Sequence, residues 1–125
     1  MTQEMIKAIH ELGNLIKSDG ASERLNHAVE DYERCEELMN LIAEYNTQQE
    51  LMASSVDADA SVREKINDRI DELYNKVTSH PVYLEYGRAK SEFDALYGEV
   101  IEELQFAVTG QRPCSHDCSS CGGCH

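Results

Sequence analysis

The chain has 125 residues, a length that fits one domain and does not comfortably fit two. Hydrophobic residues make up 41% of it, and it has only two prolines and seven glycines, which excludes a compositionally disordered chain and a turn-rich β protein. Acidic residues outnumber basic residues 24 to 11, so the formal charge is −13. This charge argues against direct binding to a nucleic-acid backbone or to anionic lipid, since both need clustered Lys and Arg.

Two features of the sequence bear on location. No apolar run reaches the ~18 residues of a transmembrane helix. The N-terminal sequence MTQEMIKAIHEL lacks the apolar stretch of a signal peptide. We therefore expect a cytoplasmic protein that does not contact membranes.

Charge and cysteine content divide the chain at Gly110. Residues 110–125 contain one basic and one acidic residue, Arg112 and Asp117, so the whole charge of −13 lies in residues 1–109. Four of the five cysteines lie in the last twelve residues. The sequence therefore predicts a helical bundle and oligomerisation domain over residues 1–109 and a Cys-rich metal-binding tail over residues 110–125.

The first two predicted helices are defined by apolar residues at helical spacing. One runs from Met5 to Ile16, and the polar residues 18–20 close it. The other is predicted from Ser22, its N-cap, to about Met52, which makes it about 45 Å long at 1.5 Å per residue. Its apolar stripe has the average period of 3.5 residues that is typical of a coiled-coil seam. So long a stripe needs another long helix to cover it.

A third helix is predicted after a break at residues 54–60. Ser61 and Glu64 have the spacing of a capping box, in which a hydroxyl and a carboxylate satisfy each other's end amides. Apolar residues at helical spacing then continue to Val77.

The fourth helix is predicted to begin at Pro81 and to end at Gly110. A residue before proline is pushed out of the helical region, so we expect His80 to cap or pack at this turn. Glycine suits the left-handed C-cap of a helix.

Because no strand pattern with a period of two occurs, the predicted fold is all-α. We expect an elongated helical bundle of about four helices, two of them long, followed by an irregular Cys-rich C-terminal tail. Wide apolar stripes on so thin a bundle favour an oligomer over a monomer.

The helical part shows no active-site motif. No histidine has the Glu-x-x-His spacing of a di-iron bundle, and the metalloprotease-like start His10-Glu11 lacks its second histidine, since Asn14 stands there. Neither a Walker A loop nor a GxGxxG loop occurs. Cys35 is expected to be a small buried hydrophobe at a seam position, and the six tyrosines to be core or interface residues. We therefore expect a protein that is not an enzyme.

The residues with distinctive chemistry are the cysteines of the tail. Thiolates bind soft or borderline metals, and two-residue gaps let neighbouring cysteines reach one metal centre. On the residues alone, an iron–sulfur cluster and a zinc ion fit equally well, and the last ligand comes from a cysteine, a histidine or another subunit. The four cysteines, spaced C-x3-C-x2-C-x2-C, are Cys114, Cys118, Cys121 and Cys124, with His116 and His125 as substitute ligands.

Other chemistries of the tail stay open. The string at residues 121–125, CGGCH, matches the haem attachment sequence of c-type cytochromes, but attachment takes place outside the cytoplasm. The CxxC pairs suit a small redox or metal-transfer protein, although the βαβ unit of a thioredoxin is missing. A structural zinc tail, a disulfide pair and an unstructured tail with adventitious metal affinity are further alternatives, of which the disulfide is disfavoured in the cytoplasm.

The order of these elements resembles the YlbF/YmcA family of small helical bacterial regulators. The likeness covers about residues 4–125. It rests on a short first helix, on a long helix with Tyr32 and Tyr45, and on the segment VTSHP at residues 77–81. A last helix with the sequence YGRAKSEFDAL at residues 86–96 and a Cys- and Gly-rich end complete the likeness.

The resemblance implies a non-enzymatic regulatory or adaptor subunit. YlbF, YmcA and YaaT form a complex that binds 4Fe–4S clusters. This complex promotes competence, biofilm formation and sporulation, and assists messenger-RNA processing by the endonuclease RNase Y. For this chain, the resemblance implies that the four tail cysteines bind such a cluster. It also implies a homo-oligomer, or a hetero-oligomer with YmcA-like and YaaT-like proteins, and RNase Y as a further partner.

Overall fold

A computed structural model describes residues 1–112 of the chain. The all-α prediction is confirmed for these residues, which contain no strand, but the number of helices is five and not about four. The helices are α1 (Gln3–Lys17), α2 (Gly20–Arg34), α3 (Glu36–Ser54), α4 (Ala60–Thr78) and α5 (Pro81–Thr109). Within the described part of the chain, no helix is both long enough and apolar enough to cross a membrane.

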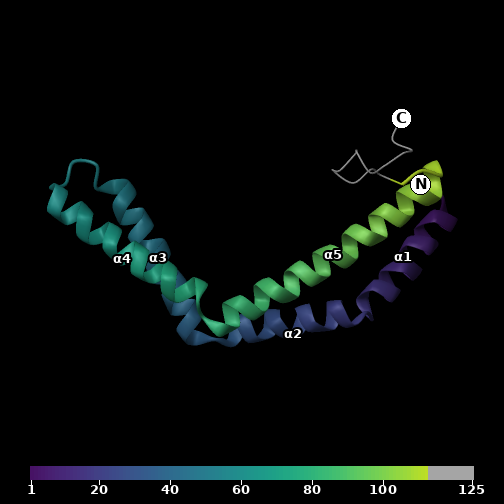
Figure 1. The fold of residues 1–125 in the computed structure, drawn as a ribbon, viewed down its shortest axis with the longest axis horizontal. Helices are drawn as coiled ribbons and strands as arrows, with labels where there is room; N and C mark the ends of the chain where they lie inside the picture. The colour runs from purple at the N-terminus through teal and green to yellow at the C-terminus, as the bar shows by residue number, and fades with distance from the viewer. Residues whose placement is uncertain (113–125) are drawn as a thin grey trace, which may run out of the picture.

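The helices form two arms that meet at a bend, as Figure 1 shows. In one arm α3 and α4 pack against each other as an antiparallel hairpin. In the other arm α2 packs along α5, and α1 extends beyond α2 toward the end of the chain's last helix. The molecule is therefore elongated, as predicted, and most of its length is only two helices thick.

The prediction of one continuous helix over residues 22–52 is wrong. The helix is interrupted at Cys35, whose backbone is extended, with φ −81° and ψ 94°. Arg34 lies in the last turn of α2, and Glu36 and Glu37 lie in the first turn of α3. A basic residue stabilises the C-terminal end of a helix dipole and acidic residues stabilise the N-terminal end, so these charges favour two helices over one continuous helix.

The start of α2 also differs from the prediction. Asp19, and not Ser22, is the N-cap, and its carboxylate accepts a hydrogen bond from the Ala21 N–H at 2.9 Å. Ser22 lies inside the first turn, where it is buried and its hydroxyl donates to the Ile16 carbonyl of α1. The serine therefore joins two helices, which is a tertiary role that capping preferences do not reveal.

The predicted capping box at the start of α4 does not form. The helix begins at Ala60, so Ser61 is already a helical residue and cannot act as the N-cap. Asp59 occupies the N-cap position, and its side chain makes no capping hydrogen bond.

Both predicted ends of α5 are confirmed. Pro81 is its first residue, and the Nδ1 of His80 accepts a hydrogen bond from the Val82 N–H at 3.2 Å. Gly110 ends the helix in the left-handed conformation, with φ 72°, and its N–H donates to the Phe106 carbonyl at 2.7 Å. Glycine adopts this conformation without the steric cost of a side chain.

The core is small and differs between the two arms. Leu38 of α3 and Leu73 of α4 are fully buried and fill the first arm. In the second arm the buried apolar residues are alanines, such as Ala28 and Ala89, which let α2 and α5 approach closely. Among residues 1–112, the buried apolar side chains are Ala21, Ala28, Leu38, Ile70, Leu73, Val77 and Ala89.

An ion pair bridges the two helices of each arm. Arg69 of α4 donates through Nε and Nη2 to the Glu44 carboxylate of α3 at 2.7 and 2.8 Å. Arg24 of α2 donates through Nε to Glu92 Oε2 of α5 at 3.0 Å. This hydrogen bond from Arg24 lowers the pKa of Glu92 below its ordinary value. Both pairs are partly exposed, so they set the register of the helices more than they add stability.

Candidate functional site

The metal ligands predicted from the sequence all lie outside the described residues. The structure shows where their segment begins, because α5 ends at Thr109 and Gly110 caps it. The tail therefore starts at the end of α5 that is far from the bend (Figure 1). The predictions that lie outside the described residues are those for Cys114, His116, Cys118, Cys121, Cys124 and His125.

Within the described residues, one group of reactive side chains gathers at the bend. We call residues 34–36 and 79–81 the elbow, because the break between α2 and α3 and the break between α4 and α5 lie there. His80 Nδ1 accepts the capping hydrogen bond, which places the ring proton on Nε2. This Nε2 lies 3.9 Å from Cys35 Sγ and 3.8 Å from Glu37 Oε2. The contact joins the α2–α3 break to the α4–α5 break.

The elbow corrects the expectation for Cys35. The residue is half-buried and begins α3 as its N-cap, whereas the sequence predicted a buried seam position inside a continuous helix. The expectation that His80 caps the Pro81 turn is confirmed. No three His, Cys, Asp or Glu side chains among residues 1–112 are placed to hold a metal ion together. The contact between Cys35 and His80 links the α2–α3 break to the α4–α5 break.

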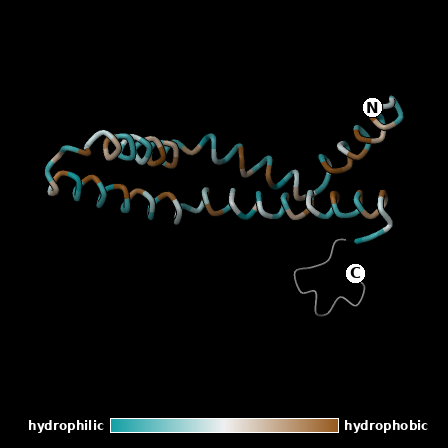
Figure 2. Tube along the Cα trace, turned by 90° about the horizontal axis from the view of Figure 1, so that it is seen from above, coloured by the Kyte–Doolittle hydropathy of each residue, from teal (hydrophilic) through white to brown (hydrophobic). Residues whose placement is uncertain are grey.

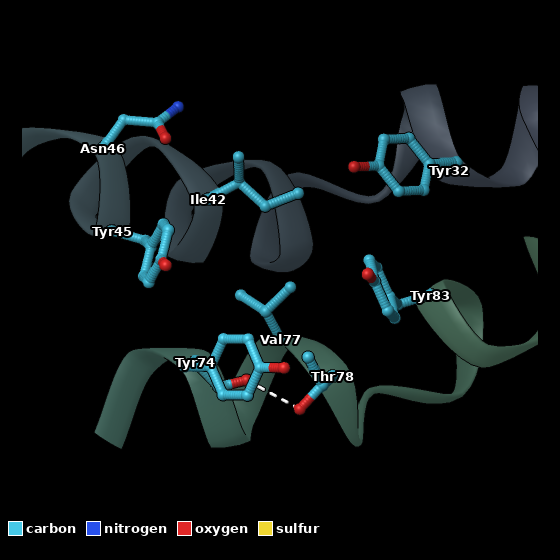
Figure 3. A pocket seen from close by; sticks show the side chains of 8 residues that line it. All are labelled: Tyr32, Ile42, Tyr45, Asn46, Tyr74, Val77, Thr78 and Tyr83. Carbon is cyan, nitrogen blue, oxygen red and sulfur yellow. Dashed lines mark hydrogen bonds between the residues drawn. The ribbon is translucent and has the colours of Figure 1, made fainter. Parts of the chain in front are cut away.

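A tyrosine-rich hollow of about 240 Å³ lies beside the elbow (Figure 3). Tyr32 stacks at a tilt on Tyr86 with ring centroids 5.1 Å apart, and Tyr45 lies 6.4 Å from Tyr74. Burial raises the pKa of Tyr32 above its ordinary value. Phenol rings with a hydroxyl at the edge can pack and hydrogen-bond at once, as tyrosines at interfaces do. The lining residues are Tyr32, Ile42, Tyr45, Asn46, Tyr74, Val77, Thr78 and Tyr83.

The second notable surface is the far end of the α2–α5 arm. We call residues 1–17 and 97–109 the open end, since α1 diverges there from the end of α5 (Figure 2). Each of residues 101–112 is exposed, and in the described chain no residue of α1 is buried. A groove of about 400 Å³ between the two helices is lined by Leu12 on one side and by Val100 and Leu104 on the other.

Exposed apolar side chains are concentrated at the open end. In the described chain, ten of the fifteen large hydrophobic residues that are exposed belong to it. In soluble proteins, large exposed apolar patches are typical of interaction sites. The ten are Met1, Met5, Ile9, Leu12, Leu15, Tyr97, Ile101, Leu104, Phe106 and Val108.

Comparison with known proteins places the chain in a family. Residues 5–109 match the family described as "Control of competence regulator ComK, YlbF/YmcA". No curated protein and no solved structure matches the chain. The match covers all five helices, from the first turn of α1 to the last residue of α5. The chain therefore belongs to the YlbF/YmcA family.

Proposed function

We propose that this protein is a non-enzymatic regulatory adaptor that acts within a protein complex and binds an iron–sulfur cluster through its tail. Membership in a family of competence regulators supports the regulatory role. The observation that carries the cluster is the set of four cysteines within residues 114–124, the first of which lies four residues after the C-cap of α5, Gly110.

The donor set of the tail fits such a cluster. Closely spaced thiolates are the usual ligands of iron–sulfur clusters, and a histidine can take the place of a cysteine as a ligand. A bound cluster supplies a centre that responds to iron supply and to oxidation. The residues proposed to hold it are Cys114, Cys118, Cys121 and Cys124, with His116 and His125 as substitutes.

The proposed mechanism is conditional assembly. Metal binding and folding are coupled, so cluster occupancy alters the surface that the tail offers to other proteins. The charge of −13 favours contacts with proteins over contacts with RNA. The proposed partners are YmcA-like and YaaT-like proteins, and through them RNase Y. The regulated processes are competence, biofilm formation, sporulation and messenger-RNA processing.

Serine variants of single tail cysteines test this function. Cys118→Ser and Cys121→Ser each remove one thiolate, and Cys35→Ser at the elbow is the matched control outside the tail. We expect both tail variants to weaken binding to the YmcA-like and YaaT-like partners at least tenfold, which is about 1.4 kcal/mol. The control should bind as the unmodified chain does, and circular dichroism should show equal helical content in all three. Unchanged partner binding in both tail variants would reject the proposal.

A further inference from the structure

We propose that the tyrosine-rich hollow beside the elbow binds an arginine side chain that is presented by a basic segment of a partner protein. The inference deepens the proposed role in a complex and rests on it for its biological meaning. Its physical basis, however, lies in the helices and not in the tail cysteines.

The hollow is formed by both arms of the molecule. Figure 3 shows Tyr45 and Tyr74, which belong to the α3–α4 arm, on one side of it. Tyr32 and Tyr83, which belong to the α2–α5 arm, lie on the other side. The volume of about 240 Å³ is below the ~300–1,000 Å³ of pockets that enclose a whole small ligand. A single long side chain therefore matches the hollow in size better than a free cofactor or substrate does.

The lining offers aromatic rings and hydroxyl oxygens but no charge. None of the eight residues that line the hollow is acidic or basic. Of the four tyrosine hydroxyls, only that of Tyr45 makes a hydrogen bond within residues 1–112, as the acceptor from Gln49 Nε2 at 2.8 Å. Aromatic faces attract cations, and phenol oxygens accept hydrogen bonds from N–H groups. The lining therefore suits a cation that carries N–H donors.

Uncompensated negative charge lies beside the hollow. Residues 32–50 and 69–83, which include all of its lining, contain seven acidic and three basic residues, a net charge of −4. Two of the three basic residues already pair with glutamates of the same segments. Asp71 is exposed, lies one helical turn before Tyr74 and makes no ion pair within the described part of the chain. Helix α3 itself contains four glutamates and no basic residue. These charges favour a basic partner over a neutral or acidic one.

Arginine is the side chain that uses all of these features. Its guanidinium is planar and weakly hydrated, stacks on aromatic rings and presents several N–H donors. The ammonium of lysine is compact and strongly hydrated, so it gains less from the rings.

The occupant is not a part of this chain. The tail starts at the end of α5 that is far from the bend, and residues 113–125 contain no Arg or Lys. A second copy carries a charge of −13, which would add repulsion at this acidic surface. A basic segment of another protein is therefore the occupant that the charges favour.

Fluorescence anisotropy of a fluorescein-labelled peptide of Gly-Arg-Gly repeats, titrated with the full chain, tests the inference. A peptide with citrulline in place of arginine keeps the shape without the charge. A lysine peptide keeps the charge without the planar group. We expect saturable binding of the arginine peptide, binding of the lysine peptide that is weaker by about threefold or more, and no binding of the citrulline peptide.

The variant Tyr74→Ala tests the hollow, and Tyr97→Ala is its matched control outside the hollow. Tyr74 is 56% exposed and its ring lies 6.4 Å from that of Tyr45, while Tyr97 is 51% exposed and its ring lies 6.1 Å from that of Phe93. We expect Tyr74→Ala to weaken binding of the arginine peptide about tenfold, which is about 1.4 kcal/mol, and the control to bind as the unmodified chain does. Tyr74→Phe keeps the ring and should retain most of the affinity. Circular dichroism checks that every variant keeps its helical content.

A second pair of variants tests the charge. Asp71→Asn and Asp57→Asn each remove one charge at an exposed aspartate that makes no ion pair among residues 1–112. Only Asp71 lies on the helix face that lines the hollow, next to Tyr74. We expect Asp71→Asn to weaken binding about threefold and Asp57→Asn to leave it unchanged.

A variant with all four tail cysteines changed to serine separates this inference from the cluster. We expect it to bind the arginine peptide like the unmodified chain, even if it binds no iron. Absence of saturable binding to the unmodified chain would overturn the inference. Equal binding of the citrulline peptide would overturn it as well, because the hollow would then not recognise a cation. Unchanged binding in Tyr74→Ala would indicate general attraction to an acidic surface, and binding lost only in the serine variant would place the contact on the tail. Both of these results contradict the inference.

Discussion

Cys35 Sγ lies 3.9 Å from His80 Nε2, so the break between α2 and α3 contacts the break between α4 and α5. Each break has its own local cause: Pro81 fixes the α4–α5 break, and the change from basic Arg34 to acidic Glu36 favours the α2–α3 break. Because α2 packs on α5 and α3 packs on α4, the two breaks meet in the folded molecule.

The first prediction concerns the capping role of His80. In His80→Ala the Val82 N–H loses its acceptor and Cys35 loses its neighbour, so the free energy of unfolding should fall by about 1 kcal/mol, the usual cost of a lost N-cap. His80→Asn restores a good capping side chain and should recover most of this loss. Urea denaturation at neutral pH measures both. Equal losses in the two variants would assign the stabilisation to the Cys35 contact instead of the cap.

The second prediction concerns the core of the α3–α4 arm. Leu73 is fully buried, so Leu73→Ala removes packed apolar surface and should lower the free energy of unfolding by about 2–5 kcal/mol. Leu51→Ala, at a position that is 44% exposed on the same arm, should change it by less than about 0.5 kcal/mol. Thermal denaturation compares them. A similar loss in both variants would contradict the burial described for this arm.

The third prediction concerns pH and the pair of Arg24 and Glu92. Because the hydrogen bond from Arg24 lowers the pKa of Glu92 in the folded protein, the ionised carboxylate is the form that stabilises the fold. This stabilisation is present above the unfolded pKa, about 4.3, and is lost as the pH falls through the lower folded value. Glu92→Gln should therefore be less stable than the unmodified chain at pH 7, and the difference should shrink below about pH 4.

A control distinguishes the pair from the general effect of removing a negative charge. Glu30→Gln removes one charge from α2, at a residue that makes no ion pair in the described chain. It should relieve repulsion in this acidic protein and leave stability at pH 7 equal or slightly higher. A loss of stability in Glu30→Gln equal to that in Glu92→Gln would remove the support for a specific pair.

The fourth prediction uses two glycines of the α5 region with opposite requirements. Gly110 has φ 72°, so Gly110→Ala should destabilise the end of the helix by about 1 kcal/mol. Gly98 lies inside the helix, and beyond its chain neighbours and the backbone of its own helical turns no atom of the described residues lies within 4 Å of an added Cβ, so Gly98→Ala should stabilise the helix by about 0.5–1 kcal/mol. Equilibrium denaturation in urea should show these opposite signs. Changes of the same sign would contradict the C-cap assigned to Gly110.

The ends of α5 were predictable from the sequence because proline and glycine act locally. Pro81 excludes a helical residue before it, and Gly110 suits a left-handed cap, whatever the rest of the chain does. The break at Cys35 has neither residue. The local sign of this break is the change from basic Arg34, at the end of α2, to acidic Glu36 and Glu37, at the start of α3. The spacing of the apolar residues alone does not reveal the break.

The candidate site shows the same division between local and tertiary information. The tail is a candidate site on the sequence alone, because four cysteines at short spacing favour soft-metal chemistry. The elbow could not be recognised from the sequence, because Cys35 and His80 are 45 residues apart and meet only in the folded molecule. The open end was anticipated in part, since wide apolar stripes indicated that the bundle needs a partner. Which residues stay uncovered depends on where α1 diverges from α5.

Metal analysis of the anaerobically purified protein tests the central claim, that the tail holds an iron–sulfur cluster. The measurement combines a UV–visible spectrum with quantification of iron, acid-labile sulfide and zinc, on the unmodified chain and on Cys35→Ser and the four-serine tail variant. We predict a brown protein with matched iron and sulfide, unchanged in Cys35→Ser and lost in the tail variant. A colourless protein that holds about one zinc per chain would contradict the account and leave the tail a structural zinc site.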